Sequence, residues 1–405
     1  MKRGILIVGG GLLQERAIAC AKKLGFEIHL VDGNSNCYCR NLVKNFYLVD
    51  CNNYKKVALI AKRLKKNKRI HGVYTQGADF AVTVSYVAKK LNFISVNLNS
   101  AIICKNKFLL RKFLTKHKLS SVKFFKVNSL ADLKKKIKKI NLPAYLKPVD
   151  NSASRGVCKI NHISECEEAF NFSIKNCSRT KLLILEEEII GPEISVDTII
   201  YNNKFYRCGI SDRKFKRKNK FAVQFASITP TSLKKKYIEE AYNLMEKASK
   251  ILKINQSAFK GDLVLDSRDK KIKIIELTPR LSGGFDAQYR KLLSFGINLI
   301  KATMLIAMNI KFDSQKMLRY KKNEYSSTFS VLMKDGFFHK YLNLRKIKKI
   351  KSIKKIFLLS KKGDIIKPLT NCSERNNFFI CLSKSFHDLL KVHKRIKSTL
   401  KVKYL

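Results

Sequence analysis

The sequence predicts an α/β protein of several domains, and three observations lead to this prediction. The first hundred residues alternate short apolar strands with amphipathic helices, which is typical of a parallel, doubly wound sheet. The next part of the chain mixes paired strands with helices. The chain has 405 residues, of which 45% are hydrophobic, so it is long enough for roughly two to four domains with their own cores.

In residues 1–100 the expected elements are strands over 5–8, 28–31, 47–49 and 72–75 and helices over 14–24, 54–65 and from about 80 to 91. Three glycines, Gly9, Gly10 and Gly11, follow the first strand. They fail the G-x-G-x-x-G dinucleotide pattern, so we expect them to start a helix close to the sheet. The apolar run before them is expected to be a buried strand, not a signal peptide.

Beyond residue 100 the expected elements are helices over 106–116, 232–253 and 289–309 and strands over 146–149, 182–185, 194–200, 262–265 and 272–277. The last two strands are expected to pair across a turn at residues 267–269. Residues 311–405 are rich in lysine with short apolar segments, and we expect a small mixed C-terminal domain of unassigned role.

The formal charge is +54, from 84 Lys and Arg against 30 Asp and Glu. Such an excess is the electrostatic footprint of a nucleic-acid-binding protein, which stays an alternative. Most of these residues are lysines spread along the whole chain, as A/T-rich codons would produce, so nucleic acid is not the expected partner. Eleven scattered cysteines fit reduced thiols in a cytoplasmic protein, and no apolar run predicts a membrane span.

A polar loop follows the strand that ends near Lys147. It contains Ser152, Ser154, Arg155 and Gly156. Backbone N–H groups and hydroxyls of such a loop can surround phosphates while Lys and Arg neutralise their charge. The alternative is an ordinary hairpin turn.

Two acidic segments come next. Glu186, Glu187 and Glu188 end one strand, and Glu193 follows a Gly-Pro turn, where it could accept hydrogen bonds from sugar hydroxyls. The alternative for these four is solvated acid on a turn.

Asp262 and Glu276 lie on the two strands expected to pair, so both carboxylates can converge on one face, where hard oxygen ligands suit Mg²⁺. Arg280 follows and could hold a transferring phosphoryl group. A structural salt bridge is the alternative here.

In this order the motifs resemble the ATP-grasp superfamily, in its carbamoyl-phosphate-synthase-like and biotin-carboxylase-like branch of carboxylate ligases. The resemblance implies a Rossmann-like preATP-grasp domain over 1–100, a two-lobed ATP-grasp domain over 101–310 with a mobile lid over about 120–190, and the C-terminal domain over 311–405.

The resemblance also implies a role for each matching residue. Lys107 and Lys147 resemble the two ATP-phosphate lysines, and residues 150–157 the loop that covers the phosphates. The adenine hinge would be Glu186, Glu187, Glu188 and Ile189, with Glu193 on the ribose. Asp262 and Glu276 would bind the metal, Arg280 would be catalytic, and Thr278 stands where the family usually has an Asn that helps to hold a second metal.

The implied function is an ATP- and Mg²⁺-dependent (or Mn²⁺-dependent) ligase that activates a carboxylate and joins it to an amine or similar nucleophile, in a protein that could form a homodimer. The alternative is a nucleotide-binding protein without ligase activity. For the acceptor substrate the candidates are residues 75–79, 211–225, with Arg213 and Lys214, and 282–286. Within the second of these, Lys216, Arg217, Lys218 and Lys220 are expected in a mobile surface loop.

Overall fold

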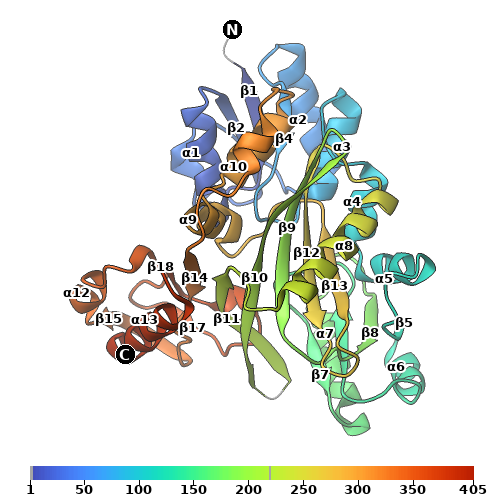
Figure 1. Cartoon of the computed structure of the whole chain (residues 1–405). Helices are drawn as coiled ribbons and strands as arrows, with labels where there is room; N and C mark the ends of the chain where they lie inside the picture. Colours follow the sequence, from blue (N-terminus) through green and yellow to red (C-terminus); the bar gives the residue numbers. More distant parts are fainter. Residues whose placement is uncertain (1–2, 219) are drawn as a thin grey trace.

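The computed structural model describes residues 3–218 and 220–405, which form four β-sheets and the helices that cover them (Figure 1). The mixed α/β fold expected from the sequence is confirmed. Among the described residues no helix is long and apolar enough to cross a membrane. All eleven cysteines are free thiols.

The N-terminal sheet is parallel, with the strand order β3-β2-β1-β4. A tight turn follows β1, and it requires glycine because a Cβ on Gly10 would lie 2.5 Å from the sulfur of Cys37. The Gly10 N–H donates to Asp32 Oδ2 at 2.6 Å, which fixes the turn at the carboxyl edge of the sheet. The elements are β1 (Gly4–Val8), α1 (Glu15–Lys23), β2 (Glu27–Asp32), β3 (Asn45–Leu48), α2 (Tyr54–Lys66), β4 (Gly72–Tyr74) and α3 (Ala81–Leu91).

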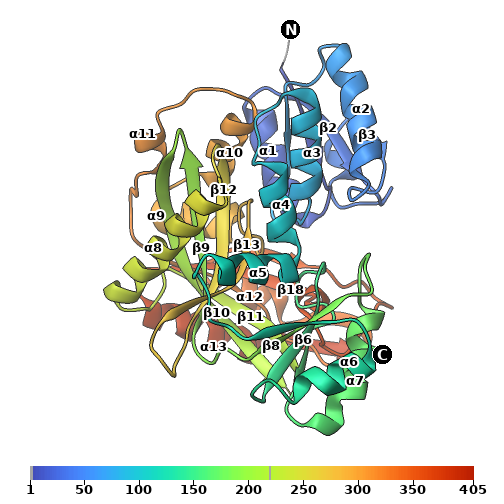
Figure 2. The ribbon, with the colours of Figure 1, turned by 90° about the vertical axis from the view of Figure 1, so that its right-hand side faces the viewer.

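A second, antiparallel sheet with the order β5-β8-β6-β7 lies at the far end of the molecule from the N-terminus (Figure 2). Its two helices pack on it around a separate apolar core that includes Leu133, Leu146 and Leu185. The elements are β5 (Phe124–Val127), α6 (Leu130–Ile137), β6 (Ala144–Pro148), β7 (Cys158–Ile160), α7 (Cys166–Lys175) and β8 (Leu183–Glu187).

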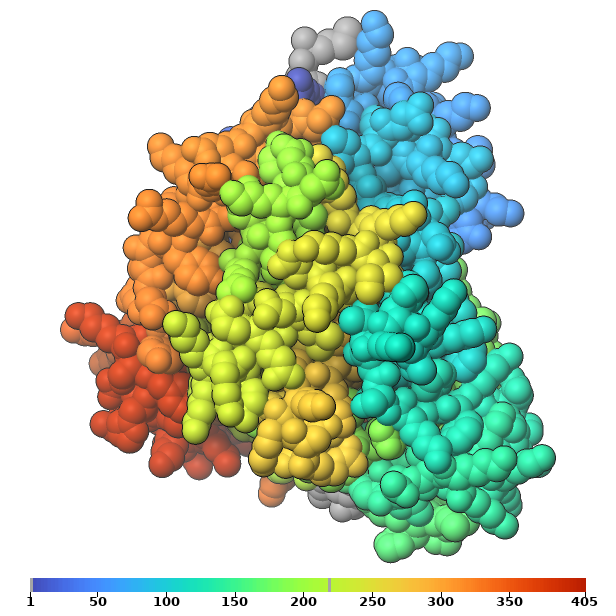
Figure 3. All heavy atoms as spheres, turned by 45° about the vertical axis from the view of Figure 1, so that its right-hand side comes forward, coloured from blue at the N-terminus to red at the C-terminus, as the bar shows by residue number. Residues whose placement is uncertain are grey.

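The largest sheet has eight antiparallel strands in the order β13-β12-β9-β10-β11-β14-β18-β16. Helices α4 (Leu98–Lys105), α5 (Lys107–Lys116) and α8 (Lys235–Ile251) pack on one face of its first strands, and α5 and α8 lie next to each other on the surface in Figure 3. The strands are β9 (Glu193–Tyr201), β10 (Lys204–Lys218), β11 (Phe221–Thr229), β12 (Ser257–Leu265), β13 (Ile272–Thr278), β14 (Tyr325–Phe329), β16 (Ile353–Leu358) and β18 (Asn377–Ser383).

The last 95 residues extend this sheet, because β14, β18 and β16 add to its edge beyond β11. A small sheet in the order β17-β15-β19 completes the C-terminal region, and α13 packs its apolar face on β14 and β18. The remaining elements are α9 (Lys291–Phe295), α10 (Leu299–Ala307), α11 (Ser314–Leu318), β15 (Gly336–Leu342), α12 (Leu344–Lys348), β17 (Ile365–Ile366), α13 (Phe386–Thr399) and β19 (Lys401–Tyr404).

Two expectations from the sequence were wrong. The helix expected over 289–309 is broken, because Gly296 ends α9 with a φ of 71° and the Asn298 side chain caps a new helix, α10. Of the residues expected in a mobile loop, Lys216, Arg217 and Lys218 instead belong to β10, which pairs with β11, and Lys220 directly precedes β11. The Arg217 guanidinium there binds Glu193 on the neighbouring strand, and Lys220 pairs with Glu168.

Candidate functional site

A cavity of about 720 Å³ opens where the N-terminal domain, the β5–β8 sheet and the eight-stranded sheet meet. Asp79 lines it from the N-terminal domain, Lys147 from β6 and Glu276 from β13, while Arg375 reaches it from the C-terminal region. The site is therefore assembled from segments that lie almost 300 residues apart in the sequence.

Most of the predicted site residues line this cavity. They are Lys107, Lys147, Ser152, Ser154, Arg155, Glu186, Glu187, Ile189, Glu193, Asp262, Glu276 and Arg280. Three others do not line it: Glu188 binds Lys159 at 2.8 Å, Gly156 packs between Pro148 and Asn176, and Thr278 is buried. The structure thus brings twelve of the fifteen to one place.

Glu186 is held by two cations on the cavity wall. Arg111 Nε donates to Glu186 Oε1 at 2.9 Å, and Lys147 Nζ donates to Oε2 at 2.6 Å. Burial alone would raise the pKa of Glu186, but Arg111 and Lys147 outweigh it and lower the pKa to about 2. Arg111 also donates to the backbone oxygen of Ile274, so it ties α5 to β8 and β13. Sequence reasoning missed Arg111, although it lies one helical turn after Lys107.

The loop at residues 150–156 presents cations to the cavity. Lys107 Nζ donates to the backbone oxygen of Asn151, and Arg155 donates to Asn151 Oδ1 at 2.9 Å and to Ser152 Oγ at 3.0 Å. Within residues 3–218 and 220–405 neither Lys107 nor Arg155 forms an ion pair with a carboxylate. Their charges are therefore free to bind an anion. The C-terminal region contacts this loop, since the Cys372 N–H donates to the Ala153 oxygen at 3.0 Å.

Asp262 lies directly opposite Glu276 in the β12–β13 ladder, so the two side chains share one face, as the sequence predicted. Asp262 Oδ2 pairs with Arg213 Nη1 at 3.1 Å and with Lys260 Nζ. Burial would raise the pKa of Asp262, but Arg213 and Lys260 lower it, so the carboxylate stays charged. Its other oxygen, Oδ1, is buried and has no hydrogen-bond partner in the described parts of the chain.

These carboxylates fit one hard cation. A buried, unpartnered carboxylate oxygen that faces a second acid is the donor set that Mg²⁺ prefers, once phosphate oxygens and water complete the shell. Among the described residues no group of three or more Asp, Glu, His or Cys side chains is arranged to hold a metal by itself. A bound nucleotide would therefore have to supply the remaining ligands.

Arg280 is held by an acid from the N-terminal domain. Its Nε donates to Asp79 Oδ1 at 3.0 Å, and Lys105 Nζ lies 4.0 Å from the other carboxylate oxygen. Burial works against the charged carboxylate, but Arg280 and Lys105 hold the pKa of Asp79 far below its usual range. Asp79 follows β4 and belongs to residues 75–79, one of the three acceptor candidates, and its carboxylate holds the guanidinium group of Arg280.

Glu193, the predicted sugar ligand, is bound by two arginines. Arg213 Nη1 lies 3.4 Å from Glu193 Oε2, and Arg217 Nη2 lies 2.9 Å from Oε1. Burial nevertheless raises the pKa of Glu193, because the two arginines offset only part of that effect. Glu193 thus lies at the cavity with both oxygens already engaged.

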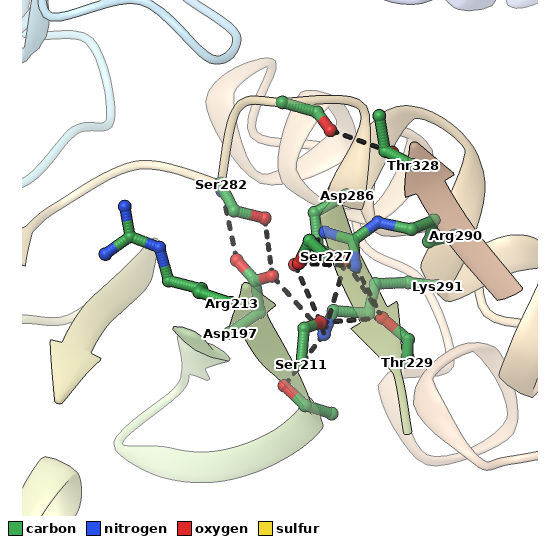
Figure 4. Close-up of polar contacts among 12 residues, drawn as sticks. Asp197, Ser211, Arg213, Ser227, Thr229, Ser282, Asp286, Arg290, Lys291 and Thr328 are labelled. Carbon is green, nitrogen blue, oxygen red and sulfur yellow. Dashed lines mark hydrogen bonds and ion pairs between the residues drawn. The ribbon is translucent and has the colours of Figure 1, made fainter. Parts of the chain in front are cut away.

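A fully buried polar network supports the wall of the cavity (Figure 4). Lys291 Nζ donates to Ser211 Oγ at 2.9 Å and pairs with Asp286 at 3.4 Å and Asp197 at 3.7 Å. Asp197 in turn accepts hydrogen bonds from both the N–H and the hydroxyl of Ser282. The network anchors the loop at residues 282–286, one of the three acceptor candidates, to the sheet. Sequence reasoning found neither Asp197 nor Lys291.

The comparison with protein families decides what this site belongs to. Residues 140–287 match the family model described as an ATP-grasp domain. Much of the site therefore lies in a segment that is similar to an ATP-grasp domain. The match spans the loop at 150–156, the acidic segment at 186–188 and the β12–β13 pair, which all contribute residues to the cavity.

Two curated relatives resemble the chain at low identity. The formate-dependent phosphoribosylglycinamide formyltransferase of Saccharolobus solfataricus is 25% identical over 202 residues, which are 49% of this chain and 50% of that protein. Human carnosine synthase 1 is 21% identical over 332 residues, 76% of this chain and 40% of that protein. The chain therefore spans about half or less of the length of these relatives.

Solved structures share the fold over the whole chain. An L-amino acid ligase from Bacillus licheniformis superimposes with a TM-score of 0.85 at 20% identity, covering 100% of this chain and 99% of that one. A phosphoribosylglycinamide synthetase from Anaerococcus prevotii gives 0.75 at 23% identity, with full coverage of both chains. The expected ATP-grasp fold is thus confirmed.

Proposed function

We propose that this protein is an ATP-grasp ligase that uses ATP and Mg²⁺ to activate a carboxylate as an acyl phosphate and to join it to an amine or a similar nucleophile. The observation that carries the proposal is the meeting of Lys107, Lys147, the Asp262–Glu276 pair and Arg280 in one cavity. Cations for phosphates, acids for a metal and a buried arginine are the parts that phosphoryl transfer requires.

The nucleotide would lie between the β5–β8 sheet and the eight-stranded sheet. Lys107 and Lys147 would bind its phosphates, and the loop residues Ser152, Ser154 and Arg155 would cover them. The backbone of the hinge at residues 186–189 would hold the adenine edge. The hydrogen bonds from Arg111 and Lys147 to Glu186 would hold this hinge in one position.

Asp262 and Glu276 would hold Mg²⁺, whose charge would neutralise the phosphate oxygens during transfer. Asp262 Oδ1 is the oxygen available for this purpose, since Oδ2 already pairs with Arg213 and Lys260.

In the first step a carboxylate oxygen of the substrate attacks the γ-phosphorus of ATP, and ADP leaves. Arg280, which donates a hydrogen bond to Asp79, would neutralise the charge on the transferring group. In the second step the amine nitrogen attacks the acyl carbon, a C–N bond forms, and phosphate leaves. Closure of the loop at residues 150–156 would keep water from the acyl phosphate.

Amino acids are the first substrate class to test. The names of two similar proteins, an L-amino acid ligase and carnosine synthase, support this choice. The cavity also has room for a nucleotide together with a small substrate, given its volume of about 720 Å³.

The test is a hydroxylamine trap, which does not require the natural amine to be known. The protein is incubated with MgATP, hydroxylamine and single carboxylic acids, starting with the amino acids, and hydroxamate and ADP are measured together. We expect a carboxylate-dependent hydroxamate in equal amount to ADP, which Glu276→Gln abolishes. ATP binding without hydroxamate or ADP from any carboxylate would overturn the ligase and leave a nucleotide-binding protein.

A further inference from the structure

Resting on the proposed function, we infer that this site binds one divalent cation with its nucleotide, and that the ammonium group of Lys260 supplies the second positive charge beside Asp262. From the sequence, the resemblance to ATP-grasp proteins implies only that Thr278 stands where the superfamily usually has an Asn that helps to hold a second metal. The structure adds a lysine that is built into the same face.

The register of β12 and β13 defines that face. Asp262 is paired with Glu276, and two residues earlier Lys260 is paired with Thr278. Because side chains two residues apart in a strand point to the same side, these four side chains lie on one face of the strand pair. Lys260 is 8% exposed and lines the cavity, so its ammonium is part of the wall and not a surface charge.

The two oxygens of Asp262 have different surroundings. Oδ2 pairs with Lys260 Nζ and also with Arg213 Nη1 at 3.1 Å. Oδ1 is buried and has no hydrogen-bond partner within the described residues. The carboxylate therefore offers one oxygen to a metal, while its other oxygen already has two cationic partners.

Thr278 does not restore a second set of ligands. Its hydroxyl is buried without a hydrogen-bond partner in the described part of the chain, and the residue does not line the cavity. A second divalent ion on Asp262 would lie close to the positive charges of Lys260 and Arg213, which would repel it. One divalent cation on Asp262 and Glu276, with the ammonium of Lys260 beside it, balances the two carboxylates without that repulsion.

The experiment counts bound ions without relying on activity. Wild-type protein saturated with ADP is titrated with Mn²⁺, and free Mn²⁺ is measured by electron paramagnetic resonance while bound ADP is measured separately by equilibrium dialysis. We expect one Mn²⁺ per chain. In Lys260→Met, which keeps a long unbranched side chain without the charge, we expect a second ion to bind.

Lys273→Met is the matched control, because Lys273 lies on the same strand pair but binds Asp266. This variant should still bind one Mn²⁺ per chain. Two ions in the wild-type protein would overturn the inference, and so would a Lys260→Met count that stays at one. Lys260→Asn replaces Lys260→Met should the latter fail to fold. ADP binding with one or two ions leaves the proposed nucleotide site standing, whereas absence of ADP binding overturns that site and the inference together.

Discussion

Arg111→Met tests whether the ion pair of Arg111 with Glu186 helps to hold the β5–β8 sheet to the eight-stranded sheet. Arg111 is 2% exposed and donates to Glu186 and to the backbone oxygen of Ile274. Methionine fills a similar volume but leaves Lys147 as the only cation paired with Glu186 among the described residues. The buried carboxylate of Glu186 would then keep one of its two cationic partners.

The magnitude follows from the pKa of Glu186. It falls from an ordinary 4.5 to about 2 in the folded protein. At about 1.4 kcal/mol per pH unit, the paired carboxylate contributes roughly 3 kcal/mol at neutral pH. Since removal of one partner from a buried pair costs about 3–5 kcal/mol, we expect Arg111→Met to lose about that much at pH 7.

The assay is urea unfolding of both proteins at pH 7 and at lower pH. Because the pKa of Glu186 is depressed in the folded state, its contribution to the free energy of unfolding is complete above pH 4.5 and is lost as the pH falls through about 2. The difference in unfolding free energy between the wild type and Arg111→Met should therefore narrow in acid. Arg207→Met is the matched control, since the Arg207–Glu239 pair is 42% exposed on both sides and should cost less than about 1 kcal/mol. A loss at pH 7 no larger for Arg111→Met than for this control would refute the reasoning.

Three further predictions concern other groups. Lys291→Met removes a fully buried cation that pairs with Asp286 and Asp197, and it leaves Arg290 as the buried cation on Asp286. It should destabilise the protein by about 3–5 kcal/mol in urea unfolding, and a loss under about 1 kcal/mol would contradict a stabilising role for the Lys291 ion pairs. Asp79→Asn should lower carboxylate-dependent ADP release by about 100-fold through misplacement of Arg280, with nucleotide binding by dialysis unchanged; equal loss of both would contradict a positioning role. Burial lowers the pKa of His393 to about 4, so the free energy of unfolding should fall as the pH drops from about 6.5 to 4. His393→Gln should remove roughly 3 kcal/mol of that fall, and a pH profile of stability equal to that of the wild type would contradict this prediction.

The motifs were predictable from the sequence because each is local. Residues 150–156 follow a strand directly, and Asp262 and Glu276 are joined by a short turn, so the spacing alone indicates that they share a face. The strands and helices of the N-terminal domain were predictable for the same reason. Each is a short apolar segment bounded by polar turns.

The partners of these residues were not predictable, because they come from distant parts of the chain. Arg111 meets Glu186 across 75 residues, and Arg280 meets Asp79 across 201. The charged run around Arg217 has the composition of a solvated loop, and only the neighbouring strand, which carries Glu193, explains why it is an ordered β-hairpin. The extension of the large sheet by β14, β18 and β16 likewise depends on pairings that no local pattern reveals.

Thermal unfolding with and without MgATP tests the central claim most directly, for the wild type and for Glu276→Gln. A ligand at 100 times its Kd adds about 2.7 kcal/mol of stability, so we expect a clear rise in Tm for the wild type that requires both ATP and Mg²⁺. Glu276→Gln should lose the part that depends on Mg²⁺. No rise in the wild type at millimolar MgATP, or an equal rise in Glu276→Gln, would contradict a metal–nucleotide site at this cavity.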